Sequence, residues 1–220
     1  MKQIVCCLFL FSFIFLYTAN AQQALFYDDI QAFKKQDSIK PPPQNAILFV
    51  GSSSFTKWKD VSDYFPGYTI INRGFGGSTL PDVIRYAADV IYPYHPKEIV
   101  IYCGENDFPA DSNATAQIVF DRFKTLYTMI RKNVGDVQVA YISLKPSPSR
   151  RKYWPKMIAA NKMIKEYTAT QKHVSFIDVW PLMMNESHQP KPEIFLNDSL
   201  HMNASGYKIW QKVIQPYLVK

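Results

Sequence analysis

Five short runs of apolar residues recur along the chain and predict buried β-strands. They are rich in Ile, Val, Phe and Tyr, and they lack the polar residue at every second position that a half-exposed strand shows. Strands with both faces covered are typical of the interior of a parallel sheet. The runs lie at residues 46–50, 68–71, 98–102, 137–142 and 174–177.

In the segments around these runs, apolar residues recur every three or four positions, which predicts amphipathic helices. Strands that alternate with helices must pair in parallel through right-handed crossovers. The pattern therefore predicts an α/β fold, a three-layer doubly wound (flavodoxin-like) sandwich with a central five-stranded parallel sheet. Ligands bind such folds beyond the carboxyl ends of the strands, so functional residues are expected just after each run. The helices are expected at residues 26–38, 80–91, 114–132, 153–170 and 204–218.

The first 21 residues have the layout of a signal peptide. Lys2 precedes an apolar run at residues 4–17. The Ala-Asn-Ala sequence at 19–21 supplies a cleavage site, and removal would leave Gln22 at the amino terminus. An uncleaved membrane anchor is the alternative, but the run is short for a membrane span. We therefore expect residues 22–220 to form a single domain, since a chain of this length has room for one core.

The formal charge of +7 is spread along the chain. The basic residues form no stripe with interleaved aromatic side chains, which a nucleic-acid surface would require. We interpret the charge as a contribution to solubility, with at most a weak attraction to anionic polymers. The sequence therefore predicts no nucleic-acid partner and, once the signal peptide is removed, no stable membrane association.

Cysteine usage excludes two kinds of stabilising site. Of the three cysteines, Cys6 and Cys7 lie in the predicted signal peptide and only Cys103 remains. One cysteine cannot form an intramolecular disulfide or a cysteine-based zinc site. Because Cys103 ends an apolar strand, we expect a buried and inert thiol.

The first strand runs directly into Gly51-Ser52-Ser53-Ser54. A glycine lets the chain turn sharply, and a serine at the start of the following helix can project its hydroxyl beyond the sheet edge. Free backbone N–H groups at such a turn can bind an anion. The alternative is that these serines only cap the helix, and this segment alone favours the cap.

Polar loops also follow the second and third strands. Three glycines lie within residues 72–78, which suits a loop whose backbone must approach another group closely, although a tight turn or a phosphate cradle has the same pattern. The third strand ends in Gly104-Glu105-Asn106-Asp107. The Asn106 amide can donate a hydrogen bond to a developing oxyanion, and an Asx-turn is the alternative role.

Near the carboxyl terminus, Asp198 precedes His201 by three residues. In one turn, the carboxylate can accept a hydrogen bond from one ring nitrogen and leave the other free. This contact fixes the tautomer and raises the basicity of the free nitrogen, which is what a serine nucleophile requires. Taken alone, a role for His201 as a polar loop residue is the alternative.

In combination, these four elements resemble the SGNH hydrolases, also called GDSL-type esterases and lipases. The first block differs from the usual Gly-Asp-Ser-Leu, because Ser52 replaces the Asp and Ser54 the Leu. This form resembles the branch related to platelet-activating-factor acetylhydrolase subunits, whose members favour small acyl groups. The resemblance makes residues 22–220 one catalytic domain. The matching blocks lie at residues 51–54, 72–78, 104–107 and 198–201.

The resemblance also implies a role for each site residue. Ser53 would be the nucleophile, His201 the general base and then acid, and Asp198 the residue that orients His201. The oxyanion hole would consist of the backbone N–H groups of Ser53 and Gly77 and the side-chain amide of Asn106. The resemblance implies no metal ion and no cofactor.

The expected substrate is an ester with a short acyl group. The sequence shows no segment for a lid or a long hydrophobic funnel. Phe75, Phe108 and Trp154 follow predicted strands or lie near their ends and are candidates to stack on a sugar ring, with core packing as the alternative. We therefore expect an esterase that removes acetyl-type groups from a carbohydrate or another small alcohol. A lysophospholipase or thioesterase is one alternative, and a noncatalytic module that binds carbohydrate or phosphate is another.

The expected location is secreted or periplasmic, in a bacterium. The signal peptide predicts export. Asn197 and Asn203 lie in Asn-x-Ser/Thr sequons on both sides of the Asp198–His201 turn, where glycans would obstruct the site. A bacterial host that does not N-glycosylate its secreted proteins would leave the site open.

Overall fold

The predicted sheet is present in the structure. The strands are β1 (Ile47–Gly51), β2 (Ile70–Gly74), β3 (Glu98–Tyr102), β4 (Gln138–Ile142) and β5 (Val174–Ile177). The computed structural model describes residues 24–220, and its five strands are parallel in the order β2-β1-β3-β4-β5. This is the flavodoxin-like order, so the predicted fold class is confirmed. The predicted signal peptide lies outside the described residues.

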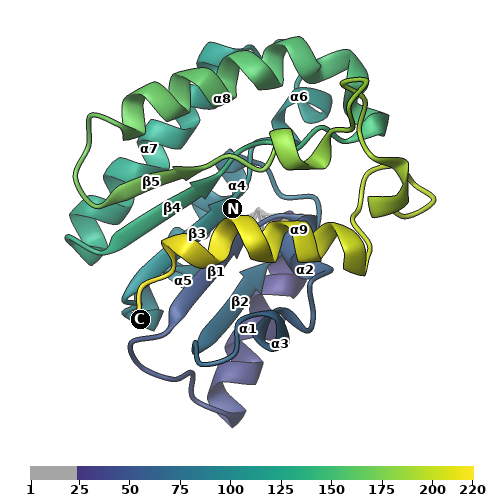
Figure 1. Ribbon diagram of the computed structural model, residues 1–220. Coiled ribbons are helices and arrows are strands. Elements are labelled where there is room, and N and C mark those ends of the chain that lie inside the picture. The colour runs from purple at the N-terminus through teal and green to yellow at the C-terminus, as the bar shows by residue number, and fades with distance from the viewer. Residues whose placement is uncertain (1–23) are drawn as a thin grey trace, which may run out of the picture.

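Helices cover both faces of the sheet, and Figure 1 shows α9 crossing one face. One face is covered by α1 (Tyr27–Ile39), α4 (Leu80–Arg85), α5 (Ala87–Val90), α7 (Ala116–Val134) and α8 (Trp154–Thr168). The other face is covered by α2 (Ser53–Thr56), α3 (Val61–Tyr64) and α9 (Ala204–Ile214). Connections contain α6 (Asp107–Ala110) and the 3-10 segments η1 (Tyr92–Tyr94), η2 (Pro148–Tyr153), η3 (Pro181–Met183), η4 (Pro192–Ile194) and η5 (Gln215–Tyr217). Within residues 24–220, no helix combines the length and the apolar character that a membrane crossing requires.

Strand side chains alternate between two apolar layers. In β1, Leu48 and Val50 pack in the layer that contains α7 and α8, whereas Ile47 and Phe49 pack under α9. All four side chains are fully buried. Burial of one such side chain stabilises the fold by about 1.5–3 kcal/mol, so an interior strand gains from an apolar residue at every position. This explains why the runs in the sequence are continuous.

The second strand lies further along the chain than its predicted range of 68–71, because two polar residues belong to it. The Asn72 amide nitrogen donates to the carbonyl oxygen of Phe55 at 2.8 Å. The Arg73 guanidinium pairs with Asp37 of α1 and donates to the Tyr94 hydroxyl at 2.6 Å. These partners satisfy side chains that an apolar pattern would place outside a strand.

The helix predicted at 80–91 is divided into α4 and α5. The backbone of Tyr86, between them, leaves helical geometry at φ −98° and ψ 10°. Its hydroxyl donates to the carbonyl oxygen of Leu25 at 2.8 Å. Its ring meets that of Phe75 edge-on, with the ring centroids 6.2 Å apart. The break thus coincides with contacts to distant parts of the chain.

Glu98, at the start of β3, gives the fold a pH-dependent stability. Its side chain is buried and accepts a hydrogen bond from the backbone N–H of Val219 at 2.8 Å. Burial raises the pKa of Glu98 to about 7, against the opposing effects of this hydrogen bond and of Lys97. The folded protein therefore favours the protonated carboxyl, and the stability from this group is lost as pH rises from about 4.5 towards 7.

We expect Glu98→Gln to stabilise the protein at pH 8 and to have little effect at pH 4.5. Both side chains are neutral at the lower pH, whereas at pH 8 only Glu98 must hold a buried charge. The expected difference in unfolding free energy at pH 8 is about 2–3 kcal/mol. Denaturant titration at both pH values measures it, with the exposed Glu186→Gln as the matched control. If the difference in unfolding free energy between Glu98→Gln and wild type were the same at both pH values, the buried charge of Glu98 would not be the cause.

Candidate active site

Ser53 is positioned by a sharp turn directly after β1. Gly51 has φ 146°, and a Cβ atom there would lie 1.9 Å from the Tyr102 carbonyl oxygen, so the turn requires glycine. Ser53 is the first residue of α2, and its backbone N–H therefore has no acceptor within the helix. Ser52 and Ser54 are only 3% and 2% exposed, whereas Ser53 is partly exposed. Of the three serines, Ser53 alone is accessible to a substrate.

His201 and Asp198 lie in the turn before α9 and meet Ser53. The His201 Nε2 atom is 2.9 Å from Ser53 Oγ, and its Nδ1 atom is 2.6 Å from Asp198 Oδ2. Asp198 Oδ1 also accepts from the backbone N–H groups of Leu200 and His201, both at 2.9 Å. The structure thus joins a hydroxyl, an imidazole and a carboxylate in the order that nucleophile activation requires.

The Asp198 carboxylate is held in its charged form. Partial burial acts to raise its pKa, but the hydrogen bonds from the His201 ring and from the two backbone N–H groups outweigh burial. The pKa of Asp198 is therefore well below its usual range. A carboxylate that stays ionised at Nδ1 favours the tautomer in which Nε2 is free to accept the Ser53 proton.

Asn106 and the glycine loop face the same side of the sheet. The Asn106 amide nitrogen donates to the Ser78 carbonyl oxygen at 3.1 Å. Gly77 has φ 91°, and a Cβ on Gly76 would lie 3.9 Å from the Ser53 Cβ, so this loop lies against the serine. The loop therefore lies beside the Ser53 side chain and the Asn106 amide.

Asp107 connects the segment after β3 to the helix that follows the glycine loop. Its fully buried carboxylate accepts from the Leu80 backbone N–H at 3.0 Å, at the start of α4. The Arg122 guanidinium donates to the other oxygen at 2.8 Å. Because Asp107 follows Asn106 directly, this contact fixes the glycine loop relative to the amide.

A buried cluster around Glu105 was not predicted from the sequence. Glu105 and Lys145 are 3% and 1% exposed and pair at 2.6 Å, and the Ser147 hydroxyl donates to Glu105 at 2.6 Å. Burial acts to raise the pKa of Glu105, but the Lys145 charge and hydrogen bonds from Lys145, Ser147 and Tyr102 hold it below its usual value. The sequence pattern that could have indicated this cluster is an acidic residue just after β3, Glu105, and a basic residue just after β4, Lys145.

Two of the three predicted aromatic contacts with substrate are wrong. Phe75 is fully buried and packs on Phe26 and Tyr86. Phe108 is 1% exposed and stacks on Tyr153. Neither ring has a free face for a sugar, so core packing is the role that both perform.

Trp154 remains a candidate for substrate contact. Its ring is partly exposed and its Nε1 donates to the Ser147 carbonyl oxygen at 3.1 Å. The Arg151 guanidinium lies 5.0 Å from the ring centroid, and Trp180 meets the ring edge-on.

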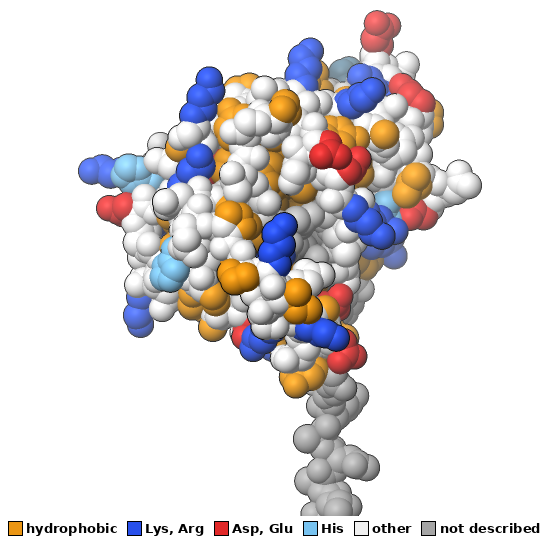
Figure 2. Space-filling view, turned by 90° about the horizontal axis from the view of Figure 1, so that it is seen from below, with side chains coloured by type: hydrophobic (Ala, Val, Ile, Leu, Met, Phe, Trp, Pro, Cys, Tyr) orange, Lys and Arg blue, Asp and Glu red, His pale blue; other side chains and the backbone are white. Residues whose placement is uncertain are grey.

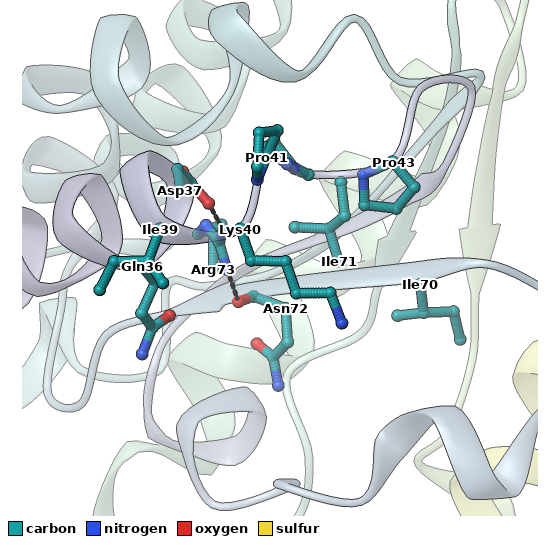
Figure 3. A pocket seen from close by; sticks show the side chains of 11 residues that line it. Gln36, Asp37, Ile39, Lys40, Pro41, Pro43, Ile70, Ile71, Asn72 and Arg73 are labelled. Atoms are coloured by element: carbon teal, nitrogen blue, oxygen red, sulfur yellow. Dashed lines mark hydrogen bonds and ion pairs between the residues drawn. The ribbon is translucent and has the colours of Figure 1, made fainter.

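A pocket of about 450 Å³ lies between α1 and β2, away from Ser53 (Figure 3). Figure 3 shows Asp37 reaching Arg73 on one side and the rings of Pro41 and Pro43 nearby. The charges of this pair neutralise each other, and the pocket contains none of Ser53, Asp198 and His201. The three prolines at 41–43 line this pocket together with residues of β2, the edge strand, and offer no N–H groups for strand pairing.

Figure 2 shows Lys and Arg side chains dispersed over one face of the molecule among apolar and polar ones. Among the described residues, no group of three or more His, Cys, Asp or Glu side chains is placed to hold a metal ion. Cys103 is a free and fully buried thiol, as predicted, and burial raises its pKa well above the usual value.

The fold and these contacts together define an ester hydrolase of the acylhydrolase class. The sequence profile of the GDSL-like Lipase/Acylhydrolase family matches residues 49–209, and the chain belongs to this family. A comparison with curated proteins finds no match.

Solved structures share the fold at low sequence identity. A GDSL-like lipase from Bacteroides thetaiotaomicron has a TM-score of 0.74 at 20% identity, over 86% of this chain and 96% of that one. A protein from Streptococcus pneumonia, provisionally described as a platelet activating factor, has a TM-score of 0.75 at 20% identity, over 87% and 92%. A carbohydrate esterase family 3 protein from Talaromyces cellulolyticus has a TM-score of 0.60 at 15% identity, over 78% and 95%.

Proposed function

We propose that the protein hydrolyses short-chain carboxylic esters through an acyl-enzyme on Ser53. The observation that carries this proposal is the 2.9 Å contact between His201 Nε2 and Ser53 Oγ, with Asp198 on the other ring nitrogen. His201 takes the proton as Ser53 Oγ attacks the ester carbonyl, and the carbonyl oxygen becomes an oxyanion. When the tetrahedral intermediate collapses, the protonated His201 gives its proton to the departing alcohol.

The acyl group leaves in the second half of the reaction. His201 removes a proton from water, which attacks the acyl-enzyme, and the carboxylic acid departs as the proton returns to Ser53. The backbone N–H groups of Ser53 and Gly77 and the Asn106 amide stabilise both oxyanions. Each donor of this kind contributes about 2.7–4 kcal/mol to lowering the barrier.

The proposed substrate is an acetyl-type ester of a carbohydrate or another small alcohol. Ser53 is partly exposed just after β1, and Gly76 and Gly77 of the neighbouring loop are exposed. Such an open site offers little apolar surface to a long acyl chain. The structural relatives add support, since one is described as an acetyl esterase and another as a carbohydrate esterase.

A series of p-nitrophenyl esters from acetate to decanoate tests the acyl preference. We expect kcat/KM to be highest for acetate or propionate and not to rise towards octanoate, because a methylene that finds no apolar partner adds no binding energy. A panel of acetylated sugars then identifies the alcohol. Highest activity on long-chain or thioester substrates would instead support a lysophospholipase or thioesterase.

A fluorophosphonate probe separates an enzyme from a noncatalytic binding module. Only an activated serine reacts with the probe. We expect covalent labelling of the folded protein, mapped by peptide mass spectrometry to Ser53, and none after heat denaturation. An unlabelled protein without esterase activity would contradict the proposed function.

A further inference from the structure

The 3-10 segment η2 contacts both parts of the proposed catalytic site. The backbone N–H of Ser149 donates to the Ser199 carbonyl oxygen at 3.0 Å, within the turn that carries Asp198 and His201. The next residue, Arg150, places its Nη2 atom 3.5 Å from Asn106 Oδ1. This distance is long for a hydrogen bond, as contacts in catalytic sites commonly are before a substrate is bound.

We propose that Arg150 is a positioning residue of the oxyanion hole, which holds the Asn106 amide so that its nitrogen faces the reacting carbonyl oxygen. This inference rests on the proposed function. An amide side chain is nearly symmetric in shape, and only its nitrogen end can donate to an oxyanion. A guanidinium has donors and no acceptor, so it can pair only with the oxygen end.

Contacts at the other end of the amide agree with this orientation. The Asn106 nitrogen donates one hydrogen to the Ser78 carbonyl oxygen at 3.1 Å, which leaves its second hydrogen for the substrate. A half-turn of the amide would place Oδ1 against that carbonyl oxygen and the NH₂ group against Arg150. The first contact would place an acceptor against an acceptor and the second a donor against a donor. Ser78 and Arg150 together therefore select the orientation in which the Asn106 nitrogen faces the substrate.

Arg150 also brings a positive charge to this place beside Asn106. Among residues 24–220 it forms no ion pair, because Glu105 pairs with Lys145, Asp107 with Arg122, and Asp198 with His201. A cation at this place favours the orientation that turns Oδ1, the negative end of the amide dipole, towards Arg150.

The side chain keeps this place at a cost in stability. The Nε atom of Arg150 is buried and has no hydrogen-bond partner among the described residues. A buried donor without a partner costs about 1–3 kcal/mol. A local feature that lowers stability beside a reactive site is typical of a functional residue.

The buried Glu105 cluster connects the segment that carries Asn106 to the segment that carries Arg150. Glu105 precedes Asn106 and holds Lys145 and Ser147, which lead into η2. The next two basic residues face aromatic rings, since the Arg151 guanidinium lies over Trp154 and the Lys152 ammonium over Tyr153, at 5.0 and 4.8 Å. Arg150 is therefore the basic residue of η2 that contacts the Asn106 side chain.

Steady-state hydrolysis of p-nitrophenyl acetate, a neutral ester, tests this role. We expect Arg150→Met to lower kcat about 10–100-fold with KM within about threefold, since the amide keeps its donors but loses one of the two contacts that orient it. Arg150→Lys keeps the charge without the planar fork and should recover part of the loss. Lys152→Met, exposed on the same segment, is the matched control and should retain wild-type kinetics. The melting temperature of Arg150→Met should be unchanged or higher, because the buried Nε donor is gone.

A double mutant identifies the residue through which Arg150 acts. If Arg150 works through Asn106, the Arg150→Met change should add little to the loss caused by Asn106→Ala. Additive losses would overturn the proposal, as would an Arg150→Met enzyme with wild-type kcat on the neutral ester. An effect confined to esters that carry a carboxylate or phosphate would also overturn it and assign Arg150 to substrate recognition. A wild-type protein inactive on every ester would overturn the proposed function itself, and this inference with it.

Discussion

Replacing Ser53 by Ala is expected to lower kcat for a short-chain ester by on the order of 10⁴–10⁶-fold and to leave the fold intact. The change removes the hydroxyl oxygen that lies 2.9 Å from His201 Nε2, so no acyl-enzyme can form. Ser53 is partly exposed, and loss of its hydroxyl leaves no buried cavity. Measurement of kcat together with the melting temperature separates the chemical effect from unfolding.

Ser54→Ala is the matched control for this prediction. Ser54 is the next residue along the chain, and its side chain is 2% exposed, so it cannot reach a substrate. We expect its kcat to stay within about threefold of wild type, with a modest loss of stability from the buried hydroxyl. If Ser53→Ala kept wild-type turnover, or if Ser54→Ala abolished it, Ser53 would not be the nucleophile.

Local sequence pattern predicts an element well where burial alone determines it. Strands β1 and β3 lie within one residue of their predicted runs, because an interior strand carries apolar side chains at nearly every position. The division of the predicted helix 80–91 at Tyr86 could not be predicted in this way. The contact of Tyr86 with Leu25 joins residues far apart in the sequence, and no window of neighbouring residues contains it.

The same distinction applies to the site. The meeting of Ser53 with His201 follows from topology, since both lie at the end of the sheet where the strands terminate. The roles of Phe75 and Phe108 could not be read from their position after strands, because burial depends on what packs over them. In the sequence, Arg150 is one of several scattered basic residues, since its partner Asn106 is brought to it only by the pairing of β3 with β4.

Asp198→Asn is expected to lower kcat by about 10³–10⁴-fold, with a much smaller change in KM. The two backbone N–H groups of Leu200 and His201, each 2.9 Å from Asp198 Oδ1, require an acceptor at that position. In the Asn variant they would fix the amide oxygen there and turn the NH₂ group towards His201 Nδ1. Nδ1 would then have to accept a hydrogen bond, which places the ring proton on Nε2, where it blocks transfer from Ser53.

Two further measurements distinguish this tautomer effect from general damage. The melting temperature of the variant should fall only slightly, because Asp198 is 46% exposed and its backbone contacts persist. Asp121→Asn, an exposed carboxylate on α7, should retain wild-type kcat. Fluorophosphonate labelling of Ser53 should slow in parallel with kcat, since both need the free Nε2 to accept a proton. Wild-type labelling in an Asp198→Asn enzyme with reduced turnover would contradict the tautomer argument, because the loss would then lie in a step after Ser53 attack.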